Sequence, residues 1–252
     1  MKNTLAKIRI DNVTYLLLFL ALISGYIKRA FLIIIIVLVH EIGHVFFFLL
    51  FKIDIESVVI YPFGGVTKVN KRIHERIYKD VLISLGGVAF QVILCFVFLL
   101  LYHNGLVVKS TIDIFIQYDT SIMLFNLLPL VPLDGSKLLL SLCSKFFSYK
   151  ICLKFQQFIG VVSLVIFIIF VLGRGLNDVI ILAFLLIKLI ELFKNNKYFL
   201  NRFYLERVLY NNYYDGIIND GDVDKMRIDK YYFFKENGRY VREEKYLLKN
   251  RF

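Results

Sequence analysis

Cysteine is scarce in this sequence, and its spacing gives no sign of a disulfide framework. Only three cysteines occur, Cys95, Cys143 and Cys152, and no two of them form a CxxC pair. Two of them lie in or beside apolar runs, where a free cysteine commonly packs as a small hydrophobic side chain. We therefore expect no disulfide framework.

The sequence also lacks a signal-peptide cleavage site and internal repeats. Lys2, Lys7 and Arg9 precede an apolar stretch, as in a signal peptide, but no small-residue cleavage site follows, and further apolar runs do. The stretch is therefore expected to be retained as a first membrane span.

Acidic residues are outnumbered, with 20 Asp and Glu against 31 Lys and Arg and a net charge of +11. An excess of basic residues can indicate a nucleic-acid partner. Here, however, the basic residues lie between apolar runs and after residue 193, as in the cytoplasmic loops of membrane proteins. The charge pattern therefore indicates membrane topology, and no nucleic-acid partner is expected.

Apolar residues dominate the chain, with a hydrophobic content of 58% and a mean hydropathy of +0.67. Soluble domains are nearer to about 45–50% apolar. A helix that crosses the bilayer needs about 20 mostly apolar residues. Runs of that order predict six membrane spans, at 13–27, 30–51, 80–102, 121–143, 155–173 and 177–193.

The connections between these runs differ in charge. One set holds most of the Lys and Arg residues, whereas the opposite set holds only Lys28, Arg29, Lys109 and Arg174. Positive charge is retained on the cytoplasmic side. A multi-pass protein with both termini in the cytoplasm is therefore expected, which agrees with an even number of spans.

Two connections are not plain loops. Residues 58–66, VVIYPFGGV, are apolar and end in paired glycines, so they predict either a short hairpin or a re-entrant segment beside protein. A surface turn with a few apolar residues remains the alternative. Residues 111–119 carry Asp113 and Asp119 on an apolar stretch and are expected at the outer membrane interface.

The strongest chemical signal is HEIGH at 40–44, inside the second predicted span. On a helix, His40 and His44 lie one above the other, so both imidazoles can bind one metal while Glu41 acts as a general base. Ionisable residues inside an apolar run are costly in hydrocarbon and are usually functional. Polar residues that only satisfy neighbouring spans would be the alternative.

A catalytic zinc needs a third protein ligand and an open position. NLLPLVPLDG at 126–135 carries two prolines and a glycine that should break the helix near Asp134. His40 and Asp134 both lie near the middle of their predicted spans, and hence within a few ångströms of the bilayer centre at about 1.5 Å per residue. Asp134 is therefore the candidate third ligand, with a turn outside the membrane as the alternative.

These two motifs resemble those of the site-2 protease family of intramembrane zinc metalloproteases, and the small six-span build resembles the sporulation branch of that family. The resemblance covers about residues 10–193. It implies one zinc per chain, held by His40, His44 and Asp134, with Glu41 as the base. It further implies that Asn126 holds substrate or the oxyanion, and that the substrate-strand hairpin includes Phe63, Gly64 and Gly65.

The sequence departs from this family in two places. The usual Gly-Pro-x-x-Asn element of the third span is replaced by SLGGVAFQ at 84–91, and it is open whether Gln91 stands for the asparagine. Ser136 replaces a glycine after the LDG motif. Neither change affects an expected metal ligand, and no PDZ-like insertion lies between the spans.

The expected fold is an all-α membrane protein of about six transmembrane helices with a short re-entrant hairpin, followed by a small cytoplasmic α+β tail. Residues 1–193 would form the protease domain and residues 194–252 a reduced docking or regulatory segment. In the tail, 231–241 predicts two strands around Asn237-Gly238, and 199–214 predicts an aromatic, basic helix.

The expected function is regulated intramembrane proteolysis of a membrane-associated sigma-factor precursor during sporulation, in the mother-cell membrane around the forespore. An anti-sigma factor or signal-peptide remnants are alternative substrates. A divalent-metal transporter is the alternative of another class, although a transporter needs no Glu between the histidines and usually has repeated halves. Membrane-protein inhibitors and self-association are further candidate interactions.

Overall fold

The computed structural model describes residues 8–10, 23, 25–61, 64–69, 73, 76–171, 176–210, 214–219 and 221–251. The chain divides into two compact units. The first comprises residues 1–71 and 82–126, and the second comprises residues 72–81 and 127–252.

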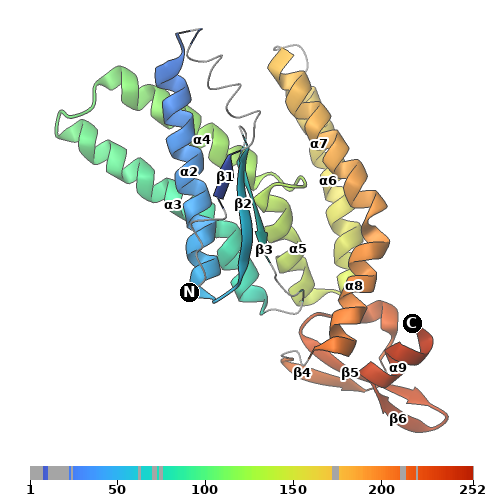
Figure 1. The fold of residues 1–252 in the computed structure, drawn as a ribbon. Helices are drawn as coiled ribbons and strands as arrows, with labels where there is room; N and C mark the ends of the chain where they lie inside the picture. The colour runs from blue at the N-terminus through green and yellow to red at the C-terminus, as the bar shows by residue number, and fades with distance from the viewer. Residues whose placement is uncertain are drawn as a thin grey trace. The chain divides into compact units, whose positions relative to one another are not determined.

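The first unit combines long apolar helices with a small sheet (Figure 1). Its helices are α2 (Ile27–Leu50), most of α3 (Ile77–His103) and α4 (Lys109–Leu127). Its sheet has the order β1-β2-β3 and is formed by β1 (Ile8–Ile10), β2 (Ile55–Tyr61) and β3 (Gly64–Val69). β1 pairs parallel to β2, and β2 pairs antiparallel to β3.

Helix α2 has one buried face and one exposed apolar face. The buried residues recur at helical spacing and include Leu32, Ile36, His40 and His44. The opposite face exposes large apolar side chains such as Phe31, Ile42, Phe46 and Leu49. Exposed apolar surface of this kind is typical of a helix that faces lipid. The helix ends where Lys52 takes a left-handed backbone, with φ of 56°.

Helices α2 and α3 approach each other closely through glycines. A Cβ atom on Gly43 would lie 2.3 Å from the carbonyl oxygen of Gly86, and a Cβ on Gly86 would lie 2.7 Å from the ring of Phe47. Small residues that let helix backbones approach are common in membrane helix packing. The glycines at 86 and 87 are thus explained by contact with the helix that carries the HEIGH motif.

The second unit contains the helices α5 to α7, followed by a tail of helices and strands (Figure 1). The helices are α5 (Asp134–Phe146), α6 (Tyr149–Val171) and α7 (Leu176–Lys194). The tail contains α8 (Asn196–Leu209), β4 (Gly216–Asn219), a short 3-10 helix η2 (Val223–Lys225), β5 (Lys230–Glu236), β6 (Arg239–Arg242) and α9 (Glu243–Asn250).

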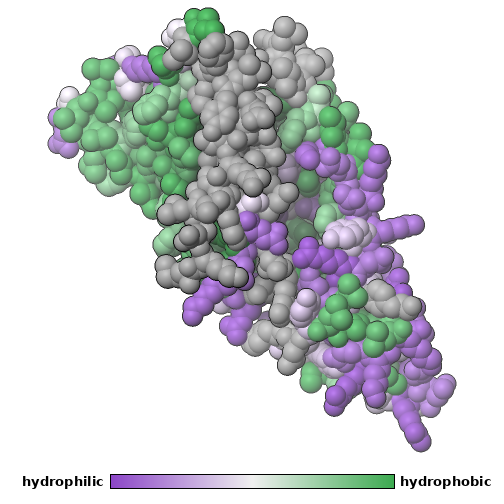
Figure 2. Space-filling model, viewed as in Figure 1, coloured by the Kyte–Doolittle hydropathy of each residue, from purple (hydrophilic) through white to green (hydrophobic). Residues whose placement is uncertain are grey.

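The tail has a core of its own residues and of residues from α6. Its sheet has the order β4-β5-β6, with β4 parallel and β6 antiparallel to β5. The buried core residues are Tyr149, Leu153, Phe203, Tyr204, Met226, Ile228, Tyr232, Phe234 and Leu247. Because Tyr149 and Leu153 belong to α6, the first turns of that helix help to form the core. Figure 2 shows mostly hydrophilic side chains over the tail strands and apolar ones over α3 and α4.

The predicted tail elements are confirmed in outline. β5 and β6 form a hairpin joined by Asn237 and Gly238, both with positive φ, as a type I′ turn requires. The predicted tail helix is α8, which starts three residues before the expected range and ends at Leu209.

The prediction of the membrane spans is confirmed only in part. Within the described residues, three helices are long and apolar enough to cross a membrane, at Ile27–Leu50, Ile77–His103 and Tyr149–Ile169. The predicted span at 13–27 lies almost wholly outside the described residues. A β-hairpin does occur at 58–66, as β2 and β3, but its entry into the membrane stays a prediction.

The predicted span at 121–143 is interrupted. Helix α4 already begins at Lys109 and ends at Leu127, and α5 begins at Asp134. The segment 111–119, expected at the interface, is part of α4. The interruption is where the prolines predicted one, because proline removes a helical hydrogen bond and clashes with the preceding turn. The depth expected for Asp134 in the membrane stays a prediction.

The expectation of unpaired cysteines is also corrected. Cys143 near the end of α5 and Cys152 near the start of α6 form a disulfide, with Cα atoms 5.6 Å apart. The sequence does not reveal this pairing because it depends on how the short connection between α5 and α6 folds back. Cys95 is free.

Candidate metal centre

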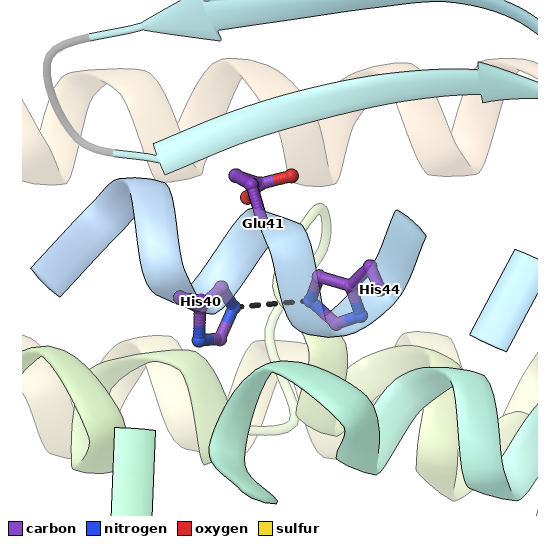
Figure 3. A group of neighbouring side chains, drawn as sticks. All are labelled: His40, Glu41 and His44. Atoms are coloured by element: carbon purple, nitrogen blue, oxygen red, sulfur yellow. Dashed lines mark hydrogen bonds between the residues drawn. The ribbon is translucent and has the colours of Figure 1, made fainter. Parts of the chain in front are cut away.

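The two histidines of the HEIGH motif meet on one face of α2. Their rings are edge to face with centroids 4.7 Å apart, and their Nε2 atoms are 3.0 Å apart. Figure 3 shows the two rings beside each other, with the Glu41 side chain leaving the helix between them on the side of the strands. His40, Glu41 and His44 are all buried, and one potential ligand atom from each lies within 4.8 Å of the others.

The other nitrogen of each ring is held by an oxygen acceptor. Nδ1 of His44 is 2.7 Å from the carbonyl oxygen of Ile83, and Nδ1 of His40 is 2.9 Å from Oε1 of Gln91. An oxygen of this kind can only accept, so both Nδ1 atoms carry the proton. In the neutral rings both Nε2 atoms then present lone pairs toward each other.

This arrangement fits a metal ion. Two Nε2 lone pairs at 3.0 Å have no hydrogen to share when both Nδ1 atoms are protonated, and a cation bound by both removes their repulsion. Metal-binding histidines almost always donate their other N–H group to an oxygen acceptor, as both do here. Among the described residues, this is the group of His, Cys, Asp and Glu side chains placed to hold a metal ion.

Space for the His40 ring is provided by α3. A Cβ atom on Gly87 would lie 2.4 Å from Cε1 of His40. Any other residue at this position would displace the ring, because real Cβ contacts are not that short. Gly87 therefore helps to set where Nε2 of His40 lies.

Asp134 belongs to the second unit and lies in the first turn of α5. Its carboxylate is buried and pairs with Nζ of Lys137 at 2.8 Å, although the Lys137 side chain itself is largely exposed. Gly135 permits the adjacent chain to approach, because a Cβ there would lie 2.1 Å from the carbonyl oxygen of Leu127. The turn that carries Asp134 is thus held tightly against residues 127 and 128.

Ser136, which replaces a glycine of the family motif, makes a contact that the sequence did not predict. Nε2 of Gln156 in α6 donates to Oγ of Ser136 at 2.7 Å and to its carbonyl oxygen at 3.2 Å. Both side chains are buried. The serine therefore ties the first turn of α5 to α6, a role that a glycine could fill only with its backbone.

The other predicted site residues are Asn126, in helix α4, and the hairpin residues Phe63, Gly64 and Gly65. Asn126 is buried near the end of α4. Gly64 and Gly65 begin β3 and pair with Tyr61 and Ile60 of β2. Phe63 lies outside the described residues.

The sequence did not predict the contacts of two residues near the histidines, Gln91 and Asp119. Gln91, whose correspondence to the family asparagine was open, contacts His40, and its Nε2 donates to Oδ1 of Asp119 at 3.2 Å. Asp119 was assigned only to the membrane interface. The available signal was that each is a polar residue within an apolar stretch, which is costly unless it is paired.

Similar sequences occur among known peptidases and related proteins. Residues 28–117 match the model of peptidase family M50. The chain is 28% identical to stage IV sporulation protein FB of Bacillus subtilis over 213 residues, which are 81% of this chain and 72% of that protein. It is also 28% identical to a zinc metalloprotease of Methanocaldococcus jannaschii over 159 residues, covering 60% of this chain and 44% of that protein.

One solved structure shares the fold. The site-2 protease from Methanocaldococcus jannaschii superposes with a TM-score of 0.57 and 21% sequence identity, over 73% of this chain and 90% of that one. The M50 match and the similarity to a zinc metalloprotease confirm the expectation of a zinc-dependent peptidase, and neither favours a metal transporter.

Proposed function

We propose that this chain is an intramembrane zinc metalloprotease of the site-2 protease family, because residues 28–117 match peptidase family M50 and the fold matches a site-2 protease. On that premise we propose the residues and the substrate class of its reaction. The observation that carries the proposal is the pair of buried imidazoles with opposed Nε2 atoms and engaged Nδ1 atoms beside Glu41. His40 and His44 are two metal ligands, and Asp134 is the third.

The zinc ion, when bound, supplies Lewis acidity that polarises the scissile carbonyl and makes water acidic near neutral pH. The carboxylate of Glu41 takes the proton from the attacking water and passes it to the leaving amine. The amide of Asn126 donates a hydrogen bond to the substrate or to its developing oxyanion. Burial of His40, Glu41 and His44 limits competing water and strengthens these interactions.

The substrate is presented as an extended strand. A transmembrane helix hides its peptide bonds, so it must unwind before it can be cut. β3 lies at one edge of the sheet and contacts α2, the helix that carries Glu41. A substrate strand that adds to this edge would bring its backbone beside the catalytic helix. Phe63, Gly64 and Gly65 belong to this hairpin, which dips into the membrane.

We propose the substrate class on the similarity to a sporulation protein. The similarity to stage IV sporulation protein FB favours a membrane-associated sigma-factor precursor and a location in the mother-cell membrane around the forespore. We propose six spans with both termini in the cytoplasm. Residues 1–193 form the protease domain, and residues 194–252 form a tail that docks the substrate.

The test is co-expression of the full chain with membrane-tethered candidate substrates, including a sigma-factor precursor. The wild type should release a fragment, and Glu41→Gln should abolish the fragment while zinc remains bound, because Glu41 is a base and not a ligand. Asp134→Asn should weaken both cleavage and zinc content.

A matched control is Glu191→Gln, since Glu191 is an exposed residue of α7 paired with Lys188. It should cut at the wild-type rate. Cleavage by Glu41→Gln at the wild-type rate would show that the role given to Glu41 is wrong. A fragment from an anti-sigma factor but from no sigma-factor precursor would replace the proposed substrate.

A further inference from the structure

A chain of buried polar contacts leads from His40 away from the metal position. Nδ1 of His40 contacts Oε1 of Gln91, and Nε2 of Gln91 donates to Oδ1 of Asp119. The three residues come from α2, α3 and α4 of one unit. Gln91 is 0% exposed and Asp119 is 4% exposed.

Burying the side chains of Gln91 and Asp119 costs free energy that apolar packing alone does not offset. Gln91 lies within the apolar helix α3, and a buried amide or carboxyl group without partners costs several kcal/mol. The hydrogen bonds between the residues offset that cost only if all of them are made at once. Packing of α3 against α4 needs neither side chain, since an apolar cluster that includes Phe98 of α3 and Ile112 and Phe115 of α4 already joins the two helices.

The contact with Asp119 decides which way the Gln91 amide faces. The two ends of a glutamine amide differ only in which is the donor and which is the acceptor. Asp119 offers an oxygen, so the NH2 group turns toward α4 and Oε1 turns toward His40. That oxygen in turn requires the proton of His40 to sit on Nδ1, which leaves Nε2 for the metal.

We propose that Gln91 and Asp119 form a positioning relay that fixes the tautomer and the ring orientation of His40 for zinc binding. The inference rests on the proposed function, since it takes His40 as a zinc ligand. Neither residue touches substrate or metal. The relay explains why a buried carboxyl group lies in the middle of α4, remote from the HEIGH motif in sequence.

The test measures zinc affinity of the purified full chain in detergent by competition with a chromophoric chelator, together with the visible absorption spectrum after cobalt substitution. Gln91→Leu and Asp119→Leu should each lower zinc affinity about 10–100-fold and change the cobalt spectrum. Asp119→Asn keeps an oxygen that can accept from Gln91, so it should stay within a few-fold of the wild type.

Matched controls lie on the same helix α4. Asp113 and Gln117 are exposed, so Asp113→Leu and Gln117→Leu should bind zinc as the wild type does. In the double variant Q91E/D119N, the new carboxylate at position 91 can accept from Nδ1 of His40. The new amide at position 119 can donate to the same carboxylate. The double variant should bind zinc within a few-fold of the wild type, a comparison that stays decisive if a leucine variant fails to fold.

Wild-type affinity in both leucine variants would overturn the relay, as would an Asp119→Asn loss equal to that of Asp119→Leu. A double variant no better than Gln91→Leu would also overturn it. Cleavage by the wild type is measured in parallel. If the wild type binds zinc but cuts no substrate, the proposed function fails while the pattern of affinities still decides the relay.

Discussion

At the scale of single residues, the position of His40 depends on the absence of a side chain opposite it. A Cβ on Gly87 would lie 2.4–2.6 Å from three atoms of the His40 ring. The ring can escape only by turning or by pushing α3 away, and either change moves Nε2. Gly87 therefore acts on the metal site through shape, whereas Gln91 acts through a hydrogen bond.

We expect Gly87→Ala to lower zinc affinity by about 10-fold or more, because ligands held out of place bind metals poorly. The measurement is chelator competition on the full chain. Gly160→Ala is the control, since a Cβ there would lie 3.0 Å from the end of the flexible Leu189 side chain. Equal zinc affinity of Gly87→Ala and the wild type would contradict the crowding explanation.

At the scale of elements, the tail is joined by a buried ion pair. Arg207 of α8 and Glu243 of α9 are both 0% exposed, and Nη1 of Arg207 lies 2.7 Å from Oε2 of Glu243. Glu243 also accepts from the hydroxyl of Tyr214 at 2.8 Å and from the backbone N–H of Tyr232 at 2.9 Å. Arg207 donates to the carbonyl oxygens of Arg227 and Lys230. This network joins α8, β5 and α9.

Removing one partner should be costly because it leaves a buried charge without compensation. We expect Arg207→Met to destabilise the tail by about 3–5 kcal/mol. Hydrogen exchange of the β5 and α8 amides in the full chain would report it as a large loss of protection. Lys249→Met is the control, because the Lys249–Glu236 pair is exposed on its lysine side and should contribute at most about 1 kcal/mol. Unchanged protection in Arg207→Met would show that the network contributes little.

The elements also show where local sequence was sufficient. The Asn237-Gly238 turn was predictable because its two positive φ values favour Asn and Gly, whatever lies around them. The break before Asp134 was predictable from proline. The start of α4 at Lys109 was not, because Asp113 and Asp119 argued for an interface, whereas Asp119 is buried through its contact with Gln91.

At the scale of the whole molecule, the charge pattern makes a prediction about topology. Reporter fusions at residue 252 and between 103 and 108, where α3 gives way to α4, should report opposite sides of the membrane. The fusion at 252 should report the cytoplasm. If both fusions report the same side, the orientation and the six-span count are wrong.

The docking role of the tail can be tested on its exposed apolar residues. Tyr198, Leu205 and Leu209 of α8 are exposed and recur at intervals of seven and four, so they share one face of the helix. Changing all three to serine should slow cleavage of a full-length substrate more than cleavage of a short tethered peptide. Unlike truncation after residue 197, this variant leaves Tyr149 and Leu153 covered.

The control for this variant is a pair of exposed apolar residues elsewhere in the tail. Tyr240→Ser combined with Leu248→Ser should leave both rates unchanged. An equal loss on both substrates with the α8 variant would argue against a docking surface on that helix.

The sequence by itself determined the metal-binding motif, the hairpin strands and the membrane character, because each depends on residues near one another in the chain. Helical spacing alone brings His40 and His44 together, and apolar content alone requires a bilayer. Only the tertiary structure decided the partners of the histidine Nδ1 atoms, the pairing of Cys143 with Cys152 and the share of α6 in the tail core. Those contacts join segments far apart in sequence, and a single polar residue in an apolar run does not say which helix will face it.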